Sequence, residues 1–310
     1  MSRKFSVQTL GLAVVMTAGI GVVAQAQQPA AQKGGGRGGA QQQAQMIQQI
    51  KPGFYVVTGA GGNTGVRVTD QGLIVVDTKN LGDQFYNALM EQIRTVSNQP
   101  VKYVVVTHHH QDHSGNIQKF VDGGAQVIAH EGLKKNLETY APPQGKPGQP
   151  NVTYAKDYNI KLGKARVQVH HYGRAHTGGD SIVYYPDLKV VQTGDVVVGV
   201  VPNFDYPFGG SVLEAQKVLA DILKLDFDTC VPGHSAPGQV TMTKADVQAY
   251  KNKLDLIISR AKELVKQGTP EDQLLAKIKT DDIGWNIATA ANWTNPQRLD
   301  PFYQELKAAK

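Results

Sequence analysis

The first half of the chain alternates short apolar runs with turns rich in glycine and polar residues. The runs consist mainly of Val, Ile and Leu, and the turn Asp70-Gln71-Gly72 is typical of a β-hairpin. A different period follows, because Phe85, Leu89 and Ile93 recur at helical spacing. The pattern predicts strands at residues 54–58, 63–69, 73–77, 101–106 and 126–129, and helices at residues 83–97, 114–121 and 131–140.

The second half repeats this organisation after a Pro/Gly-rich loop at residues 141–150. Ser211 and Thr243 are expected to cap helices, and Glu214, three residues after Ser211, is typical of a capping box. Two strand-rich blocks, each with helices, indicate an α/β fold. The pattern predicts strands at residues 152–160, 166–171, 181–185, 189–192 and 229–231, and helices at residues 211–223, 243–266 and 270–279.

The N-terminal segment has the features of a cleavable secretory signal peptide, residues 1–26. Arg3 and Lys4 precede an apolar stretch at residues 10–23, and Ala24-Gln25-Ala26 is a typical cleavage site. The stretch is too short for a comfortable membrane span, and no lipid-anchor cysteine follows it, so we expect a periplasmic or secreted protein without a stable membrane anchor. Residues 27–49, rich in Gln, Ala and Gly, predict a low-complexity flexible leader.

Composition narrows the function classes. Cleavage after Ala26 would lower the formal charge from +6 to +4, which is mildly basic, and the basic residues are scattered, so no nucleic-acid partner is expected. The single cysteine, Cys230, excludes an intrachain disulfide. The remaining length suits one large α/β domain.

The chain places a dense group of metal-binding residue types at residues 107–113, directly after a predicted strand. Imidazole and carboxylate are ligands that zinc prefers. In an extended segment His108 and His110 point the same way and His109 points the other way. A bend just afterwards would bring Asp112 and His113 to an adjacent position, which suggests two metals. The run is internal and interrupted, unlike a purification tag.

Further candidate ligands lie in Gly-rich turns at the ends of predicted strands. His176 stands in Ala175-His176-Thr177-Gly178-Gly179, Asp195 ends Thr193-Gly194-Asp195, and His234 follows Pro232-Gly233. Loops held by a rigid sheet often carry functional groups, and glycine lets the backbone approach a site closely.

The order of these motifs resembles the metallo-β-lactamase fold superfamily over roughly residues 51–235. The resemblance implies a four-layer αββα sandwich at residues 50–240, with a C-terminal helical extension, residues 241–310, packed on the same domain. The matching positions are His108, His110, Asp112 and His113 of an HxHxDH signature, His176 of the second motif, Asp195 of a Thr-Gly-Asp motif and the final His234.

The resemblance also implies how two zinc ions per chain would be held. The first would be bound by His108, His110 and His176, and the second by Asp112, His113 and His234. Asp195 would bridge both metals, and Asp77 would support the metal loop from outside the ligand set. His109 is expected to pack or hydrogen-bond behind the loop.

The implied activity is hydrolysis of an amide or ester bond by a metal-bound hydroxide, with Asp112 as a catalytic residue that orients the nucleophile. The substrate would be a small molecule: a β-lactam, a lactone or a thioester. Against a β-lactamase proper, Val196, Val197 and Val198 stand where those enzymes often carry carboxylate-binding residues. The aromatic residues of the loop 202–208 either wall the pocket or pack the loop.

Other classes remain open. A persulfide-dioxygenase-like enzyme would use one iron on the same scaffold, but here the second set of ligands is complete. A non-catalytic binding protein would usually have lost ligands, and a nuclease would normally carry an extra domain between Asp195 and His234. The C-terminal residues 243–310 could cover the sandwich or pair two subunits of a homo-oligomer.

Overall fold

The computed structural model describes Met1 and residues 44–309. The predicted signal peptide and most of the predicted leader lie outside the described residues. Within the described part of the chain, the strands form two sheets, and the alternation of apolar side chains along them determines which layers pack together. No helix of the described residues is long and apolar enough to cross a membrane.

Seven strands of the described residues form the first sheet, in the order β1 to β7. Its first four strands are antiparallel neighbours, whereas β4 to β7 run parallel. The strands are β1 (Met46–Lys51), β2 (Phe54–Thr58), β3 (Thr64–Thr69), β4 (Gly72–Val76), β5 (Val101–Val105), β6 (Gln126–His130) and β7 (Val152–Tyr154).

Six strands of the described residues form the second sheet, in the order β13-β12-β11-β10-β9-β8. Only the β11–β12 pair is parallel among its described neighbours. The strands are β8 (Asp157–Leu162), β9 (Ala165–His170), β10 (Ile182–Tyr185), β11 (Val190–Gln192), β12 (Thr229–Val231) and β13 (Met242–Thr243).

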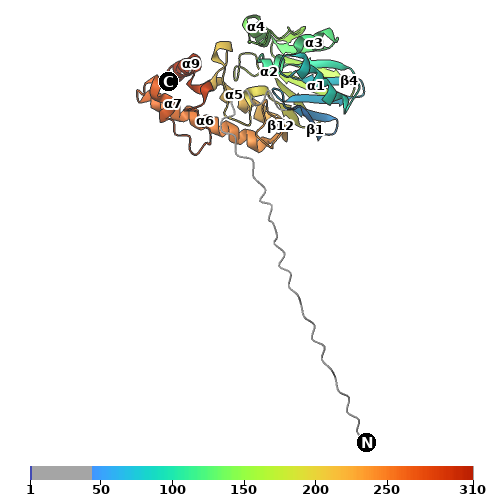
Figure 1. Ribbon diagram of the computed structural model, residues 1–310. Helices are drawn as coiled ribbons and strands as arrows, with labels where there is room; N and C mark the ends of the chain where they lie inside the picture. Colours follow the sequence, from blue (N-terminus) through green and yellow to red (C-terminus); the bar gives the residue numbers. More distant parts are fainter. Residues whose placement is uncertain (2–43, 310) are drawn as a thin grey trace. The chain divides into compact units, whose positions relative to one another are not determined.

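The two sheets pack face to face, and helices cover both outer faces (Figure 1). Along β4, Ile74 and Val76 enter the core between the sheets, whereas Leu73 and Val75 pack outward under helices. This confirms the predicted αββα sandwich. The outer helices are α1 (Asp83–Arg94), α3 (Ile117–Asp122) and α4 (Glu131–Thr139) on the first sheet, and α5 (Val212–Lys224) and α6 (Lys244–Lys266) on the second.

The C-terminal helices continue the outer layer of the second sheet. These are α6, α7 (Glu271–Lys277), α8 (Ala291–Thr294) and α9 (Pro296–Ala308). Leu274, Trp293 and Phe302 are buried in the same apolar cluster as the buried face of α5. Thr243 caps α6 as predicted and forms a capping box with Asp246.

The structure corrects three element predictions. The strand expected at residues 152–160 is two strands, because the chain leaves the first sheet after β7 and joins the second at β8. The leader predicted to residue 49 ends earlier, because β1 pairs with β2 and the Gln45 side chain donates a hydrogen bond to the Phe85 carbonyl. The low-complexity composition gave no sign of β1, because this strand is stabilised by its backbone hydrogen bonds to β2.

A third correction concerns the helix predicted at residues 114–121. It is divided into α2 (Gln111–Ser114) and α3, with Gly115 and Asn116 between them. A Cβ at Gly115 would clash with the backbone at Asn80 and Leu81. The Asn116 side chain donates to the carbonyls of Thr78 and Asn80. The break therefore anchors the loop 107–113, which carries predicted metal ligands, to the segment that follows β4.

Candidate metal centre

The predicted ligand side chains come together from loops at the ends of strands in both sheets. His108 and His110 follow β5, and His113 lies in α2. The second sheet contributes His176 before β10, Asp195 after β11 and His234 after β12. Residues far apart in the sequence thus meet because their strands end at the same edge of the sandwich.

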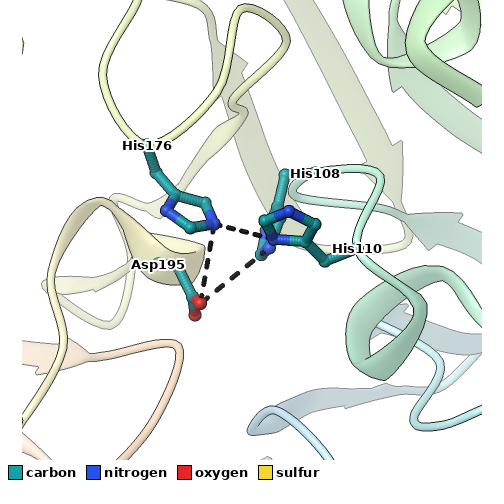
Figure 2. Close-up of side chains that lie close together, drawn as sticks. All are labelled: His108, His110, His176 and Asp195. Carbon is teal, nitrogen blue, oxygen red and sulfur yellow. Dashed lines mark hydrogen bonds and ion pairs between the residues drawn. The ribbon is translucent and has the colours of Figure 1, made fainter. Parts of the chain in front are cut away.

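The first group consists of His108, His110, His176 and Asp195, whose ligand atoms all lie within 4.8 Å of one another. Figure 2 shows the imidazoles and the carboxylate converging on one point. The closest pair is His110 Nδ1 and His176 Nε2, 2.9 Å apart. Asp195 Oδ2 lies 3.7 Å from His176 Nε2 and 4.0 Å from His108 Nε2.

The second group consists of Asp112, His113 and His234, which also lie within 4.8 Å of one another. His234 Nε2 is 3.1 Å from Asp112 Oδ2 and 3.2 Å from His113 Nε2. Asp195 reaches this group as well, because its Oδ1 lies 3.2 Å from His113 Nε2 and 3.4 Å from His234 Nε2. The two oxygens of Asp195 therefore face different groups, which is the geometry a bridging carboxylate needs.

Hydrogen bonds on the outer side of the first group fix which ring nitrogens carry protons. His176 Nδ1 lies 2.6 Å from the Asn203 carbonyl, which can only accept, so Nδ1 donates. His110 Nε2 lies 2.7 Å from Asp205 Oδ2 and donates to that carboxylate. In the neutral rings, the facing nitrogens His176 Nε2 and His110 Nδ1 are then both lone pairs, 2.9 Å apart.

The same logic applies to His108 and His113. Thr107 Oγ1 donates to Asp77 Oδ2 at 2.8 Å, so it accepts from His108 Nδ1 at 3.1 Å. His113 Nδ1 donates to Asp77 Oδ2 at 2.8 Å. His108 therefore directs an unprotonated Nε2 inward. Burial opposes charging of His113, but Asp195, Asp112 and Asp77 outweigh it and hold its pKa well above its usual value, so a metal would take the place of its Nε2 proton. His108 Nε2 has no hydrogen-bond partner within the described part of the chain.

Inward lone pairs at buried positions repel one another unless a cation lies between them. A divalent metal satisfies all of them at once, and mixed imidazole and carboxylate donors suit zinc among the common metals. The donor set, the fixed tautomers and the orphaned His108 nitrogen therefore fit a metal site.

Electrostatics differ between the two groups. Burial and the neighbouring imidazoles hold the pKa of His108 well below its usual value, and burial lowers the pKa of His110. Burial opposes charging of His234 as well, but Asp195 and Asp112 outweigh it and raise its pKa to about 9. Burial alone would raise the pKa of Asp195, yet His234 and His113 hold it well below its usual range. The site carboxylates are therefore ionised at neutral pH.

Asp205 is a site residue that the sequence did not reveal. It lies in the loop 202–208, whose aromatics pack the loop: Phe204 contacts Trp293 edge-on at 5.7 Å, and Phe208 contacts His109 at 4.4 Å. The contact of Asp205 with His110 spans 95 residues of sequence. An acidic residue in a loop gives no signal of such a partner.

His109 lies outside the two predicted ligand groups and packs behind the loop, where its Nε2 is 4.0 Å from Asp205 Oδ2. Its ring lies between Phe208 and Tyr140, with centroid distances of 4.4 and 4.8 Å. It is fully buried, and burial lowers its pKa to about 2. His109 therefore stays neutral and acts as a packing residue.

Close backbone approach explains two glycines of the site. A Cβ at Gly62 would clash with the His113 ring, and a Cβ at Gly233 would clash with the Asp195 carboxylate.

Lys79, fully buried, donates from Nζ to the carbonyls of Val57 and Gly62, at 2.7 Å each. Burial lowers the pKa of Lys79 to about 7. The lysine thus holds the glycine loop against the second group.

Comparison with known proteins places this architecture in a family. Residues 57–234, more than half of the chain, match the family model of the metallo-beta-lactamase superfamily. The chain belongs to the metallo-β-lactamase superfamily. The matched region begins in β2 and ends at His234, so it contains every predicted ligand.

Individual members of the superfamily are distant relatives. A metallo-beta-lactamase type 2 of Elizabethkingia meningoseptica is 26% identical over 161 residues, covering 49% of this chain and 61% of the relative. A linear primary-alkylsulfatase of Pseudomonas sp. is 23% identical over 256 residues, covering 67% of this chain and 48% of the relative. The chain thus spans about half to three fifths of the length of these relatives.

Among solved structures, the fold is similar to that of an inverting sec-alkylsulfatase from Pseudomonas sp., with a TM-score of 0.66 and 17% sequence identity. The superposition covers 84% of this chain and 50% of that chain. The likeness extends well beyond the region 57–234 that the family model matches.

Proposed function

We propose that this protein is a metal-dependent hydrolase with two zinc ions that cleaves an amide or ester bond in a small molecule. His108, His110 and His176 would hold the first ion, and Asp112, His113 and His234 the second. Asp195 would bridge the two. The observation that carries the proposal is the pair of facing nitrogens on His110 and His176, 2.9 Å apart, because the outer nitrogen of each ring is held by an acceptor and a metal ion would bind both inward lone pairs.

Bound zinc would lower the pKa of a coordinated water from about 16 to near 7 and polarise the bond under attack. The chain's own residues supply the geometry. The carboxylate of Asp112 remains 34% exposed, so it is placed to orient an attacking water by accepting its hydrogen bond. Asp195, 9% exposed, would hold the two metal sites at a fixed separation.

Solvent exposure indicates the side from which a substrate would arrive. The side chains of Asp112 and His234 are 34% and 27% exposed, whereas those of His108 and His176 are 1% exposed. A substrate therefore meets the second group first. The reacting carbonyl would bind on the Asp112 and His234 side, with the first group behind it.

The β-lactamase alternative has less support from this chain than hydrolysis of other esters or amides. Val196, Val197 and Val198, which follow Asp195, are buried in the apolar cluster with α5 and α6. Their side chains offer no hydrogen-bond donor for a drug carboxylate. We therefore place lactones and thioesters ahead of β-lactams, and we include an alkyl sulfate in the test because one relative bears the name alkylsulfatase.

Export belongs to the same proposal. The basic residues Arg3 and Lys4, the apolar stretch 10–23 and the Ala24-Gln25-Ala26 site would direct the chain out of the cytoplasm, with a mature protein that begins at Gln27. Mass spectrometry of the protein recovered from a periplasmic extract would detect that N-terminus. An intact Met1 in the folded protein would contradict export.

The experiment is a hydrolysis assay on the zinc-loaded mature protein with a panel of chromogenic substrates. The panel holds a cephalosporin, a lactone, a thioester, a p-nitrophenyl ester and an alkyl sulfate. We expect turnover of at least one, its loss after chelation and in Asp112→Ala, and full turnover in the surface control Thr139→Ala. Unchanged turnover in Asp112→Ala or in chelated protein would overturn the proposal.

A further inference from the structure

The loop 202–208 holds the outer nitrogens of two predicted ligands of the first metal. The Asn203 carbonyl accepts from His176 Nδ1 at 2.6 Å, and Asp205 Oδ2 accepts from His110 Nε2 at 2.7 Å. The position of this loop therefore sets the direction in which both imidazoles present their inward lone pairs. Residues that hold this loop in place therefore also affect the geometry of the predicted metal ligands.

The C-terminal helices hold the loop at three successive points. Trp293 of α8 donates from Nε1 to the Pro202 carbonyl at 2.8 Å. Arg298 of α9 brings Nη2 to 3.6 Å from Asp205 Oδ1. Tyr206 donates its hydroxyl hydrogen to Glu305 Oε2 of α9 at 2.8 Å. Each contact comes from a residue beyond 234, outside the part of the chain that the family model matches.

These contacts are shielded from water, which strengthens them. The side chains of Arg298 and Asp205 are 16% and 7% exposed, and Trp293 is 5% exposed. Arg298 is itself fixed, because Nη1 donates to Asn292 Oδ1 at 2.9 Å. The guanidinium is therefore a rigid, largely buried cation beside the carboxylate that orients His110.

We propose that α8 and α9 position the ligands of the first metal through the loop 202–208, with Arg298 holding Asp205 against His110 and Trp293 holding the backbone at Pro202. Arg298 and Trp293 are positioning residues, since neither lies among the ligand groups. This inference rests on the proposed function, because it requires that the first group binds a metal.

This arrangement should strengthen the binding of a metal by the first group. A carboxylate that accepts from a ligand histidine fixes the ring and makes its inward nitrogen more basic, and loss of such a partner typically weakens metal binding 10- to 100-fold. Arg298 acts one step further out, by holding the Asp205 carboxylate in place against His110. Its loss should therefore weaken the first metal by roughly 10-fold, near the lower end of that range.

The test is zinc binding by the mature full-length protein, measured by competition with a chelating dye. We expect Arg298→Met to weaken one of the two binding steps about 10-fold and Arg298→Lys to recover part of the loss. His176→Ala and His234→Ala identify which step belongs to which group. The matched control is Arg260→Met, because Arg260 of α6 forms an ion pair with Asp282, in the segment between α7 and α8, and its hydrogen-bond and ion-pair partners in the described part of the chain lie outside the loop 202–208.

A second readout separates positioning from general destabilisation. Cobalt substituted for zinc reports ligand geometry through its visible absorption, and we expect a changed spectrum in Arg298→Met and Trp293→Phe but the wild-type spectrum in Arg260→Met. Trp293→Phe removes the donor to Pro202 and keeps a smaller aromatic ring between Phe204 and Phe302, so it carries the test if Arg298→Met does not fold. Wild-type zinc affinity and cobalt spectrum in the folded variants would overturn the inference, whereas a wild-type protein that binds no metal would overturn the proposed function itself.

Discussion

Asp77 holds two parts of the metal centre at once. Its Oδ1 accepts from the Thr107 backbone at 2.7 Å, and its Oδ2 accepts from Thr107 Oγ1 and from His113 Nδ1, at 2.8 Å each. It is fully buried and has a positive φ of 68°, a conformation that Asp and Asn tolerate better than most residues. One carboxylate therefore orients the His113 ring directly and the His108 ring through Thr107.

Asp77→Asn should weaken zinc binding by about 10- to 100-fold while keeping the backbone conformation. An amide offers one acceptor oxygen where the carboxylate offers two, so at least one of the contacts with Thr107 and His113 is lost. Zinc competition with a chelating dye measures the loss, and circular dichroism checks the fold. Wild-type affinity in a folded Asp77→Asn protein would show that His113 needs no such partner.

Lys79 makes the unfolding free energy of the protein depend on pH. Its pKa is lowered by burial from 10.5 to about 7, so above pH 7 the folded protein releases a proton that the unfolded chain keeps until about pH 10.5. The unfolded state then binds more protons, and stability rises with pH in this window. The penalty for burying the charged amine is complete below pH 7 and is relieved above it.

Comparison of wild type with Lys79→Met isolates this effect. We expect the wild type to gain unfolding free energy relative to Lys79→Met between pH 7 and 9, by at most about 1.4 kcal/mol per pH unit. Denaturant unfolding at several pH values measures the difference. A difference that stays constant over this range would mean that Lys79 keeps its ordinary pKa in the folded protein.

Among the elements, the strands were the easiest to predict and the loops the hardest. Short apolar runs located β2 and β4, because one face of each packs between the sheets and the other packs under helices. The pattern did not reveal the switch from β7 to β8, since Val152, Tyr154, Tyr158 and Ile160 keep a period of two on either side of Lys156 while the hydrogen-bonding partner changes. Partners are a property of the folded chain.

The candidate site shows the same division. The ligand residue types were visible because they cluster in short motifs next to predicted strands. Asp205 was not visible, since its role depends on a contact with His110 across 95 residues. Lys79 was missed for a similar reason, because nothing local indicates that Val57 and Gly62 would accept from a buried amine.

The cap of α6 is an element whose contribution can be measured in isolation. Thr243 accepts from the Asp246 backbone at 3.1 Å, and Asp246 accepts from the Thr243 backbone at 2.8 Å. Thr243→Ala should lower the unfolding free energy by about 1 kcal/mol and leave zinc binding unchanged. Thr139→Ala, at the exposed end of α4, is the matched control. A Thr243→Ala protein as stable as the control would contradict the capping account.

For residues 44–309 taken together, the two sheets and the C-terminal helices serve one centre. The first sheet contributes the HxHxDH motif, the second contributes His176, Asp195 and His234, and α8 and α9 brace the loop behind the first group. Under the proposed function, the buried first group would hold a metal and the more exposed second group would receive the substrate. This division would depend on two ions and on a carboxylate that both share.

The zinc content of the mature wild-type protein tests this account most directly. Elemental analysis after gel filtration should give two zinc ions per chain, and one each in His176→Ala and His234→Ala. Two ions in the wild type with one in each variant would support two separate groups joined by Asp195. A single iron per chain, or a protein free of metal after purification in zinc, would contradict the account.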